Sequence, residues 1–245
     1  MPDERMSAAL ALLGDAPERA AVQHRASTLA AVALGVDGIC AGVGTGPQGV
    51  VLAWGRETVA VAVEGLEFTL GEGPSRDAVI AGVPVLVADL DVPDQLARWP
   101  AFAYSVSGFP VRAVFAFPLR IGAISVGVLT AHRAVPGSLT DRQLANALTL
   151  ADAVALLLVH RVALGPDADA DPGPGPERGL RPGWEQPATC RPDVHQATGM
   201  ISVQLEVSLA EALVRLRAHA YAEDRPVAEI AADVLARRLR LTGLY

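Results

Sequence analysis

Residues 113–130 read AVFAFPLRIGAISVGVLT and hold two adjacent runs of strand-forming residues. The first run, Ala113–Leu119, is rich in β-branched and aromatic residues. In the second run, Ile124–Thr130, the residues Ile124, Val126 and Val128 alternate with the set that begins at Ser125. Runs of this length and composition predict two strands, so this part of the chain is expected to belong to a β-sheet.

The segments outside these strands predict helices at both ends of the sheet region. Thr140–Leu164 carries apolar residues at helical spacing, and Thr140 with Gln143 has the pattern of a capping box. Pro17–Leu34 also predicts a helix, with Pro17 at its first position and Gly35 just past its end.

Between these two helices the chain predicts more strands, at Val36–Cys40, Val50–Trp54, Glu57–Val63 and Pro84–Ala88, and a short helix at Arg76–Ala81. Gly55-Arg56 separates two of the runs and suits a type II′ hairpin. Helices at the ends and strands between them predict an α+β domain with a central antiparallel sheet and flanking helices.

A change in composition after residue 164 divides the chain. Residues 165–192 hold seven prolines and five glycines, which do not sustain a helix or a sheet, so they predict a flexible linker. The predicted organisation is therefore a domain over residues 1–164, a linker over 165–192 and a small helical module over 193–245. Limited proteolysis is expected to cut between Gly165 and Pro192 and to leave two stable fragments.

Three short amphipathic helices are predicted after the linker. The first begins at Pro192, and the second opens with a capping box of Ser208 and Glu211. The third opens at Pro226 and is expected to run to about Thr242. Together they predict a minimal three-helix bundle.

Composition limits the functional classes. The net charge is −7 and all 20 basic residues are arginine, so the overall balance does not favour nucleic acid. The acidic excess lies before residue 191, however, and the C-terminal module is the least acidic part of the chain. No export signal or membrane span is indicated, which predicts a cytoplasmic protein.

Catalytic and metal-binding patterns are not indicated. Cys40 and Cys190 lie far apart with no CxxC motif, which argues against a disulfide framework and a zinc site. His132 has no second histidine nearby, and Cys40 would have no resolving thiol within the N-terminal domain. The sequence therefore predicts a protein that is not an enzyme, and it identifies no cofactor.

Residues 194–231 read VHQATGMISVQLEVSLAEALVRLRAHAYAEDRPVAEIA and resemble the ANTAR family of RNA-binding modules. The residues at the family's positions are Ala197, Gly199, Ala212, Leu216, Arg217, Ala220 and Ala231. Residues 65–90 and 98–133 resemble a GAF domain, the kind of sensor often fused to an ANTAR module.

The resemblance implies a GAF–ANTAR transcription antitermination regulator. Its sensor domain would bind a small molecule and control a module that binds paired stem-loops in nascent RNA. The RNA-binding candidates are His195, Arg215, Arg217, His219, Arg237 and Arg238. Thr198 stands where the family commonly has lysine, and Ser202-Val203 where it has a basic residue. At these two positions the module therefore lacks basic side chains that would contact phosphates of the RNA.

The sequence is also compatible with other functions of the C-terminal module. The module could be a diverged docking or dimerisation unit, favoured by Leu235 and Leu239 off the main stripe of the third helix. Arg217 could pack or pair with Asp224 instead of binding RNA. A DNA-binding helix-turn-helix is disfavoured because the third helix begins with apolar and acidic residues. A homodimer is expected because Val154, Leu157 and Val159 lie outside the main stripe of the 140–164 helix.

Overall fold

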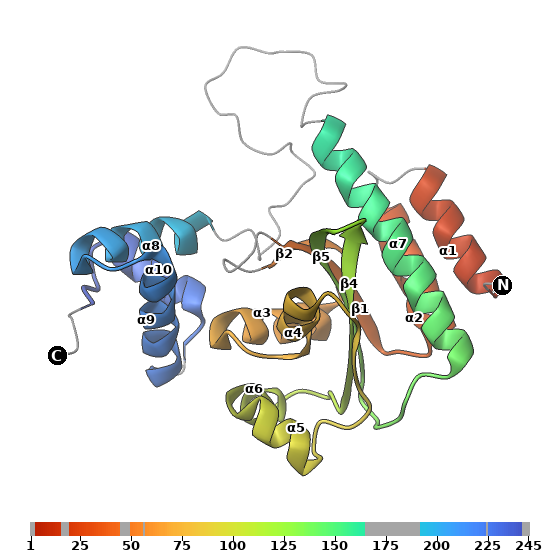
Figure 1. Cartoon of the computed structure of the whole chain (residues 1–245), viewed down its shortest axis with the longest axis horizontal. Coiled ribbons are helices and arrows are strands. Elements are labelled where there is room, and N and C mark those ends of the chain that lie inside the picture. The colour runs from red at the N-terminus through yellow and green to blue at the C-terminus, as the bar shows by residue number, and fades with distance from the viewer. Residues whose placement is uncertain are drawn as a thin grey trace.

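The computed structural model describes residues 3–15, 20–44, 50–55, 57–164, 192–223 and 225–241. An α+β domain extends to Leu164, and a unit of three helices begins at Pro192 (Figure 1). Residues 165–191 of the predicted linker lie outside the described residues.

The sheet has five strands in the order β2-β1-β5-β4-β3, and all neighbouring strands are antiparallel. The strands are β1 (Gly38–Gly44), β2 (Val50–Trp54), β3 (Val85–Val87), β4 (Ala113–Ile121) and β5 (Ile124–Arg133). The two strands predicted from residues 113–130 are confirmed. They form a hairpin in which Ile121 pairs with Ile124, and Gly122 supplies the positive φ of the turn, 60°.

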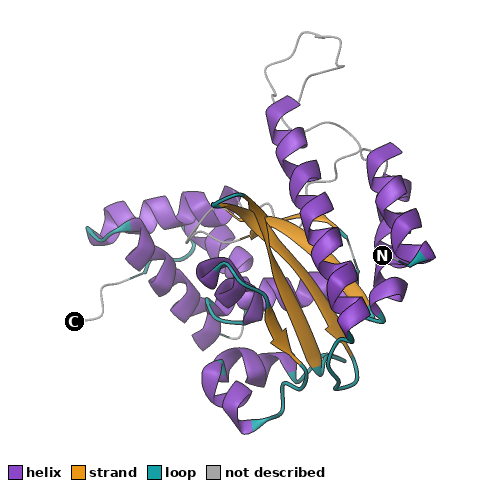
Figure 2. Ribbon diagram, turned by 45° about the vertical axis from the view of Figure 1, so that its right-hand side comes forward, coloured by secondary structure: helices purple, strands orange, loops and turns teal. Residues whose placement is uncertain are grey.

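Helices cover both faces of the sheet (Figure 2). On one side lie α1 (Glu4–Asp15), α2 (Ala20–Leu34) and α7 (Asp141–Leu164), and on the other lie α3 (Thr58–Leu70), α4 (Pro74–Ala81), α5 (Pro93–Arg98) and α6 (Pro100–Val106). β4 serves both cores, because Phe115 and Phe117 pack in the α1–α2–α7 core, whereas Val114 and Ala116 pack in the core on the α3 side. The expected antiparallel sheet with flanking helices is confirmed.

The predicted capping box at the start of α7 is present. Thr140 Oγ1 accepts a hydrogen bond from the Gln143 amide at 3.3 Å, and Gln143 Oε1 accepts one from the Thr140 amide at 2.9 Å. By length and composition α7 could cross a membrane, as could the bent pair of helices that follows Pro192 taken together. In the structure α7 instead places Leu150 and Val154 in the core of the sheet domain.

The predicted strand Glu57–Val63 is wrong, because these residues begin helix α3. Both carboxylate oxygens of Glu57 accept hydrogen bonds from the first turn, from the Val59 amide at 3.0 Å and the Ala60 amide at 2.8 Å. The hairpin expected at Gly55-Arg56 does not form, and β2 pairs with β1. The local TVAVAV pattern favours a strand, but burial follows helical spacing through Ala60, Val63 and Glu67.

The three helices of the C-terminal unit are α8 (Pro192–Leu205), α9 (Leu209–Ala222) and α10 (Val227–Leu235). They surround a core that includes Ile201, Leu216 and Ile230, and Ser208 caps α9 by accepting from the Glu211 amide at 3.2 Å.

The third helix ends at Leu235, which is earlier than expected. Arg237 follows in a left-handed conformation with φ 58°, so the chain turns there and does not continue as a helix toward Thr242. Gln204 holds the returning segment by donating to the Leu241 carbonyl at 2.9 Å. Leu235 and Leu239, which favoured the docking alternative, pack partly buried against the core of the unit.

Candidate functional site

The C-terminal half of α3 is where the two parts of the protein meet. Phe68 is 6% exposed and belongs to the same cluster of buried side chains as Leu213 and Leu216 of α9. α9 runs beside the end of α3 (Figure 1). We call this contact the α3–α9 interface. It joins the sheet domain directly to the core of the three-helix unit.

Arg217 is the charged residue at the centre of the α3–α9 interface. It is 8% exposed, and its guanidinium carbon lies 5.1 Å from the centroid of the Phe68 ring, within the range of a cation–π contact. A methyl group at Gly71, the C-cap of α3, would lie 3.3 Å from Nη1 of Arg217. The cation therefore sits at the negative end of the α3 dipole, where a positive charge is favourable.

The other predicted RNA-binding residues are more exposed, and most of them are paired with acids. Arg215 bonds Glu211 at 2.6 Å, His219 lies 3.0 Å from Glu223, and Arg238 bonds Asp233 at 2.7 Å. His195 lies exposed on α8, and Arg237 lies exposed after α10.

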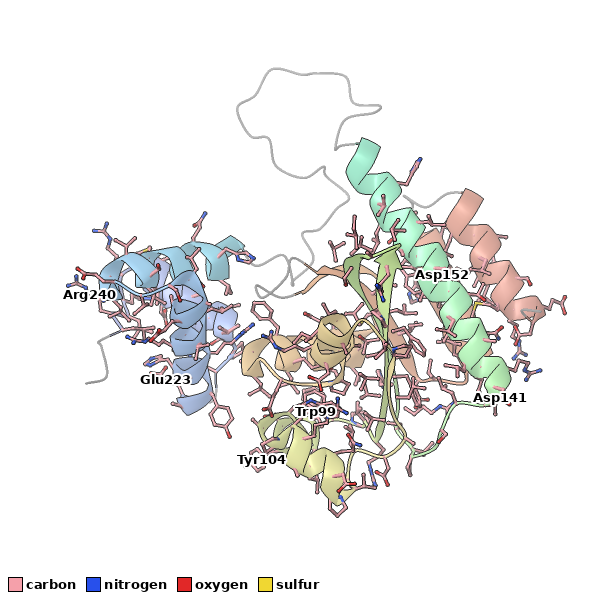
Figure 3. All side chains as sticks on the ribbon, in the orientation of Figure 1. Trp99, Tyr104, Asp141, Asp152, Glu223 and Arg240 are labelled. Carbon is pink, nitrogen blue, oxygen red and sulfur yellow. The ribbon has the colours of Figure 1, made fainter. Side chains whose placement is uncertain are left out.

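The six candidates do not form one cluster. Arg215 and His219 share one flank of α9, Arg217 faces α3, and the C-terminal arginines lie beyond α10, with Arg240 at the outer end of the unit (Figure 3). Arg225, which the sequence did not single out, joins Arg238 in bonding Asp233 and also bonds Glu223 and Glu229. Much of the positive charge of the unit is therefore balanced locally.

Buried polar side chains line the face of α3 that packs on the sheet. Glu67, 5% exposed, accepts hydrogen bonds from the Ser75 amide at 2.8 Å, the Arg76 amide at 3.3 Å and the Ser75 hydroxyl at 3.0 Å. It thereby caps α4, whose own N-cap residue, Gly73, has no side chain to do so. Glu72 caps α6 in the same way through the Ala101 amide at 2.8 Å.

The pKa of Glu67 predicts an unusual pH dependence. Burial raises this pKa to about 8, although the hydrogen bonds from Ser75 and Arg76 oppose the rise. The folded protein thus binds the proton more tightly than the unfolded chain. The contribution of this proton to the free energy of unfolding is complete below about pH 4. It is lost as the pH rises toward the pKa of Glu67 in the folded protein, by at most about 1.4 kcal/mol per pH unit.

Glu67→Gln is therefore expected to flatten the fall in melting temperature between pH 5 and pH 8. The glutamine oxygen can still accept from the two backbone amides, and its NH₂ can donate to Ser75, so the cap survives. Thermal unfolding of wild type and variant at several pH values measures the effect. Parallel profiles for the two proteins would show that Glu67 does not titrate in this range.

Glu57 and His132 form a second polar contact, near the N-terminal end of α3. Nε2 of the buried His132 lies 3.0 Å from Oε2 of Glu57. Burial opposes ionisation of Glu57, but the Val59 amide and His132 outweigh it and hold the pKa of Glu57 below its ordinary value. A methyl group at Gly38 would collide with both side chains, so a residue without Cβ is required on β1 at this point.

Cys40 lies beneath α3 and is poorly suited to act as a nucleophile. It is 2% exposed, and its thiol lies 3.8 Å from the Ala60 carbonyl, to which it donates. Burial raises the pKa of the thiol well above its ordinary value, and the nearby carboxylates Glu64 and Glu67 raise it further. This setting disfavours the thiolate needed for attack on a sulfoxide or a disulfide.

Most of the described tryptophan and phenylalanine residues of the sheet domain are core residues. Trp54, Trp99, Phe102, Phe115 and Phe117 are at most 2% exposed. The exceptions are Phe68, at the α3–α9 interface, and Phe109, which is partly buried beside α6.

The sequence holds no match to any protein-family model, and no curated protein matches it. Among solved structures, the chain is similar to the GAF domain of a phosphoenolpyruvate-protein phosphotransferase from Coxiella burnetii, with 16% identity, 65% of this chain and 94% of that one covered, and a TM-score of 0.49. The chain is also similar to the GAF domain of the Acinetobacter phosphoenolpyruvate-protein phosphotransferase, with 12% identity and a TM-score of 0.46. This match covers 67% of this chain and 98% of that one.

Another similar structure is a free methionine-R-sulfoxide reductase from Neisseria meningitidis in complex with its substrate, with 17% identity and a TM-score of 0.45. This match covers 64% of this chain and 87% of that one. The structural neighbours of this chain thus include GAF domains, which match about two thirds of its length, and also an enzyme.

Proposed function

We propose that this protein is a signal-responsive regulator of transcription antitermination, in which the sheet domain controls an RNA-binding three-helix unit. The observation that carries the proposal is the burial of Arg217 against Phe68. Arg217 is both a residue of the ANTAR-like motif and the cation held at the end of α3. While the unit stays docked, this cation is not available to a phosphate.

Docking divides the candidate RNA contacts into two groups. Arg215 is accessible and pairs with Glu211 only at the surface, where such pairs contribute about 0.5 kcal/mol and a phosphate can replace the carboxylate. Arg217 becomes available only after the α3–α9 interface opens. A signal that loosens this interface would therefore add a phosphate contact and increase RNA affinity.

The test is the salt dependence of binding to a synthetic RNA with two adjacent hairpins, followed by fluorescence anisotropy. Binding should weaken as salt rises, and Arg215→Ala should lower the slope of log affinity against log salt by about 0.9. Arg120→Ala, on an exposed arginine of β4, is the matched control and should leave binding unchanged. If wild type binds this RNA without salt sensitivity, or not at all, the unit is a protein-docking module and the proposal is wrong.

Homodimerisation through α7 is part of the proposal. Two of the residues expected to support it do not, since Val154 is fully buried and Leu157 is 9% exposed, both within the core of the sheet domain. Val159 is exposed as expected, at 37%, and Leu148 and Leu156 are exposed at 43% and 62% on the same side of the helix.

Leu156→Glu is expected to convert a dimer into a monomer, because the charge would be buried without a partner in a symmetric interface. Light scattering at micromolar concentration measures the molecular mass. Val203→Glu, at an apolar residue of α8 that is 82% exposed, controls for added charge and should not change the mass. A wild-type protein that is already monomeric would refute dimerisation.

A further inference from the structure

A cleft of about 730 Å³ lies between the sheet domain and the three-helix unit. Its walls come from α3 and the end of α6 on one side, and from the end of α9 and the start of α10 on the other. It uses the side of α3 that carries Leu66 and Thr69, whereas Ala60 and Glu67 face the sheet. The cleft is therefore distinct from the buried polar side chains that lie between α3 and the sheet.

The lining of the cleft has the composition of a small-molecule site. Leu66 and Phe109 give apolar surface, Thr69 and Ser105 give hydroxyl groups, and Tyr104 and Tyr221 add two aromatic rings. These tyrosines are 78% and 54% exposed, which is unusual for residues with so much apolar surface. Ligand pockets are commonly of this size, mostly apolar with a few polar groups, and placed between domains.

The charges around the cleft restrict what it can bind. Among the described residues, the one charged side chain in its lining is Arg225, whose guanidinium bonds Glu223 at 3.2 Å, Glu229 at 3.3 Å and Asp233 at 2.8 Å. This cation is thus already neutralised by carboxylates that outnumber it. An anionic ligand would find no available positive charge there, whereas a neutral or cationic one would meet no repulsion.

We infer that the cleft is a binding site for a small planar aromatic molecule that is neutral or positively charged. Its ring lies between Tyr104 and Tyr221 and against Leu66, and the hydroxyl groups of Thr69 and Ser105 bond its polar substituents. Because the ligand contacts both parts of the protein, it binds only while they are docked. This inference concerns the docked structure and holds whether or not the unit binds RNA.

Three probes with one ring system and different charge test the inference on the full-length protein: 2-naphthol, 2-naphthylmethylamine and 2-naphthoate. Binding is followed by equilibrium dialysis and by saturation-transfer NMR. The neutral and cationic probes should bind, and the carboxylate should bind at least several-fold more weakly. Tyr104→Ala and Tyr221→Ala should each weaken binding about tenfold, because each removes a stacking ring. Both side chains are exposed, so the fold is expected to be retained.

Val203→Ala, on the exposed surface of α8, is the control and should bind the probes as wild type does. The inference is overturned if none of the probes binds, if 2-naphthoate binds as well as the other two, or if both tyrosine variants keep wild-type affinity. Probe binding that survives a substitution separating the two parts would also overturn it, because the site needs both walls.

Discussion

Phe68→Ala is expected to detach the three-helix unit from α3 and leave both cores folded. The Phe68 ring is buried in the cluster of the three-helix unit and contacts Arg217, and an alanine at this position would leave a cavity in that cluster and remove the cation–π contact without adding a charge. Loss of a buried phenylalanine costs about 3 kcal/mol, which shifts the docking equilibrium by roughly a hundredfold. The two parts should then remain joined only through the chain.

Small-angle scattering and hydrogen exchange measure this effect. The radius of gyration should increase, and amides at the end of α3 and along the facing side of α9 should exchange faster. Ile80→Ala is the matched control, because this residue of α4 is 72% exposed and does not line the cleft between the two parts. An unchanged radius of gyration for Phe68→Ala would mean that Phe68 does not hold the interface.

Arg133→Ala should cause the largest loss of stability among substitutions of arginine in the sheet domain. The guanidinium donates to the carbonyls of Leu34 at 3.2 Å and Gly35 at 2.6 Å, at the end of α2. It also donates to the Gly137 and Ser138 carbonyls and to Gln143, at the start of α7. One side chain thus connects β5 with two helices and satisfies carbonyls that would otherwise lose their partners.

The expected cost of Arg133→Ala is about 3 kcal/mol, or a fall in melting temperature of roughly 10 °C. Arg120→Ala removes only a hydrogen bond to the Gly82 carbonyl at 2.9 Å from an exposed arginine and should cost less than about 1 kcal/mol. Thermal unfolding of the two variants side by side makes the comparison. Equal losses would show that the bonds of Arg133 are replaced by water at no cost.

The sequence predicts the elements whose signals are local. Thr140 and Gln143, and Ser208 and Glu211, have capping-box spacing, and both helices begin where these pairs indicate. The sequence pattern does not predict helix α3, because its alternating valines favour a strand. The residue that caps the helix, Glu57, is also a glutamate, which is an uncommon N-cap. Gly71 after Leu70 was the available signal, since a left-handed glycine commonly ends a helix.

The candidate site is harder to predict, because it depends on a tertiary contact between helices that are far apart in the sequence. Arg217 flanks the buried stripe of α9, a position that is usually solvated, and only the docking of α3 buries it. The roles of Phe68 and Gly71 depend on the same contact, for which the sequence has no local signature. Glu67 also caps a helix other than its own, and the spacing of residues along one helix does not indicate such a contact.

RNA binding by Phe68→Ala, measured beside wild type over a series of salt concentrations, tests the central claim most directly. With the two-hairpin RNA, the variant should bind more tightly, and its salt slope should be steeper by about 0.9 because Arg217 is released to a phosphate. Adding Arg217→Ala to Phe68→Ala should return the slope to the wild-type value. Equal affinities and equal slopes for wild type and Phe68→Ala would contradict control of RNA binding through the α3–α9 interface.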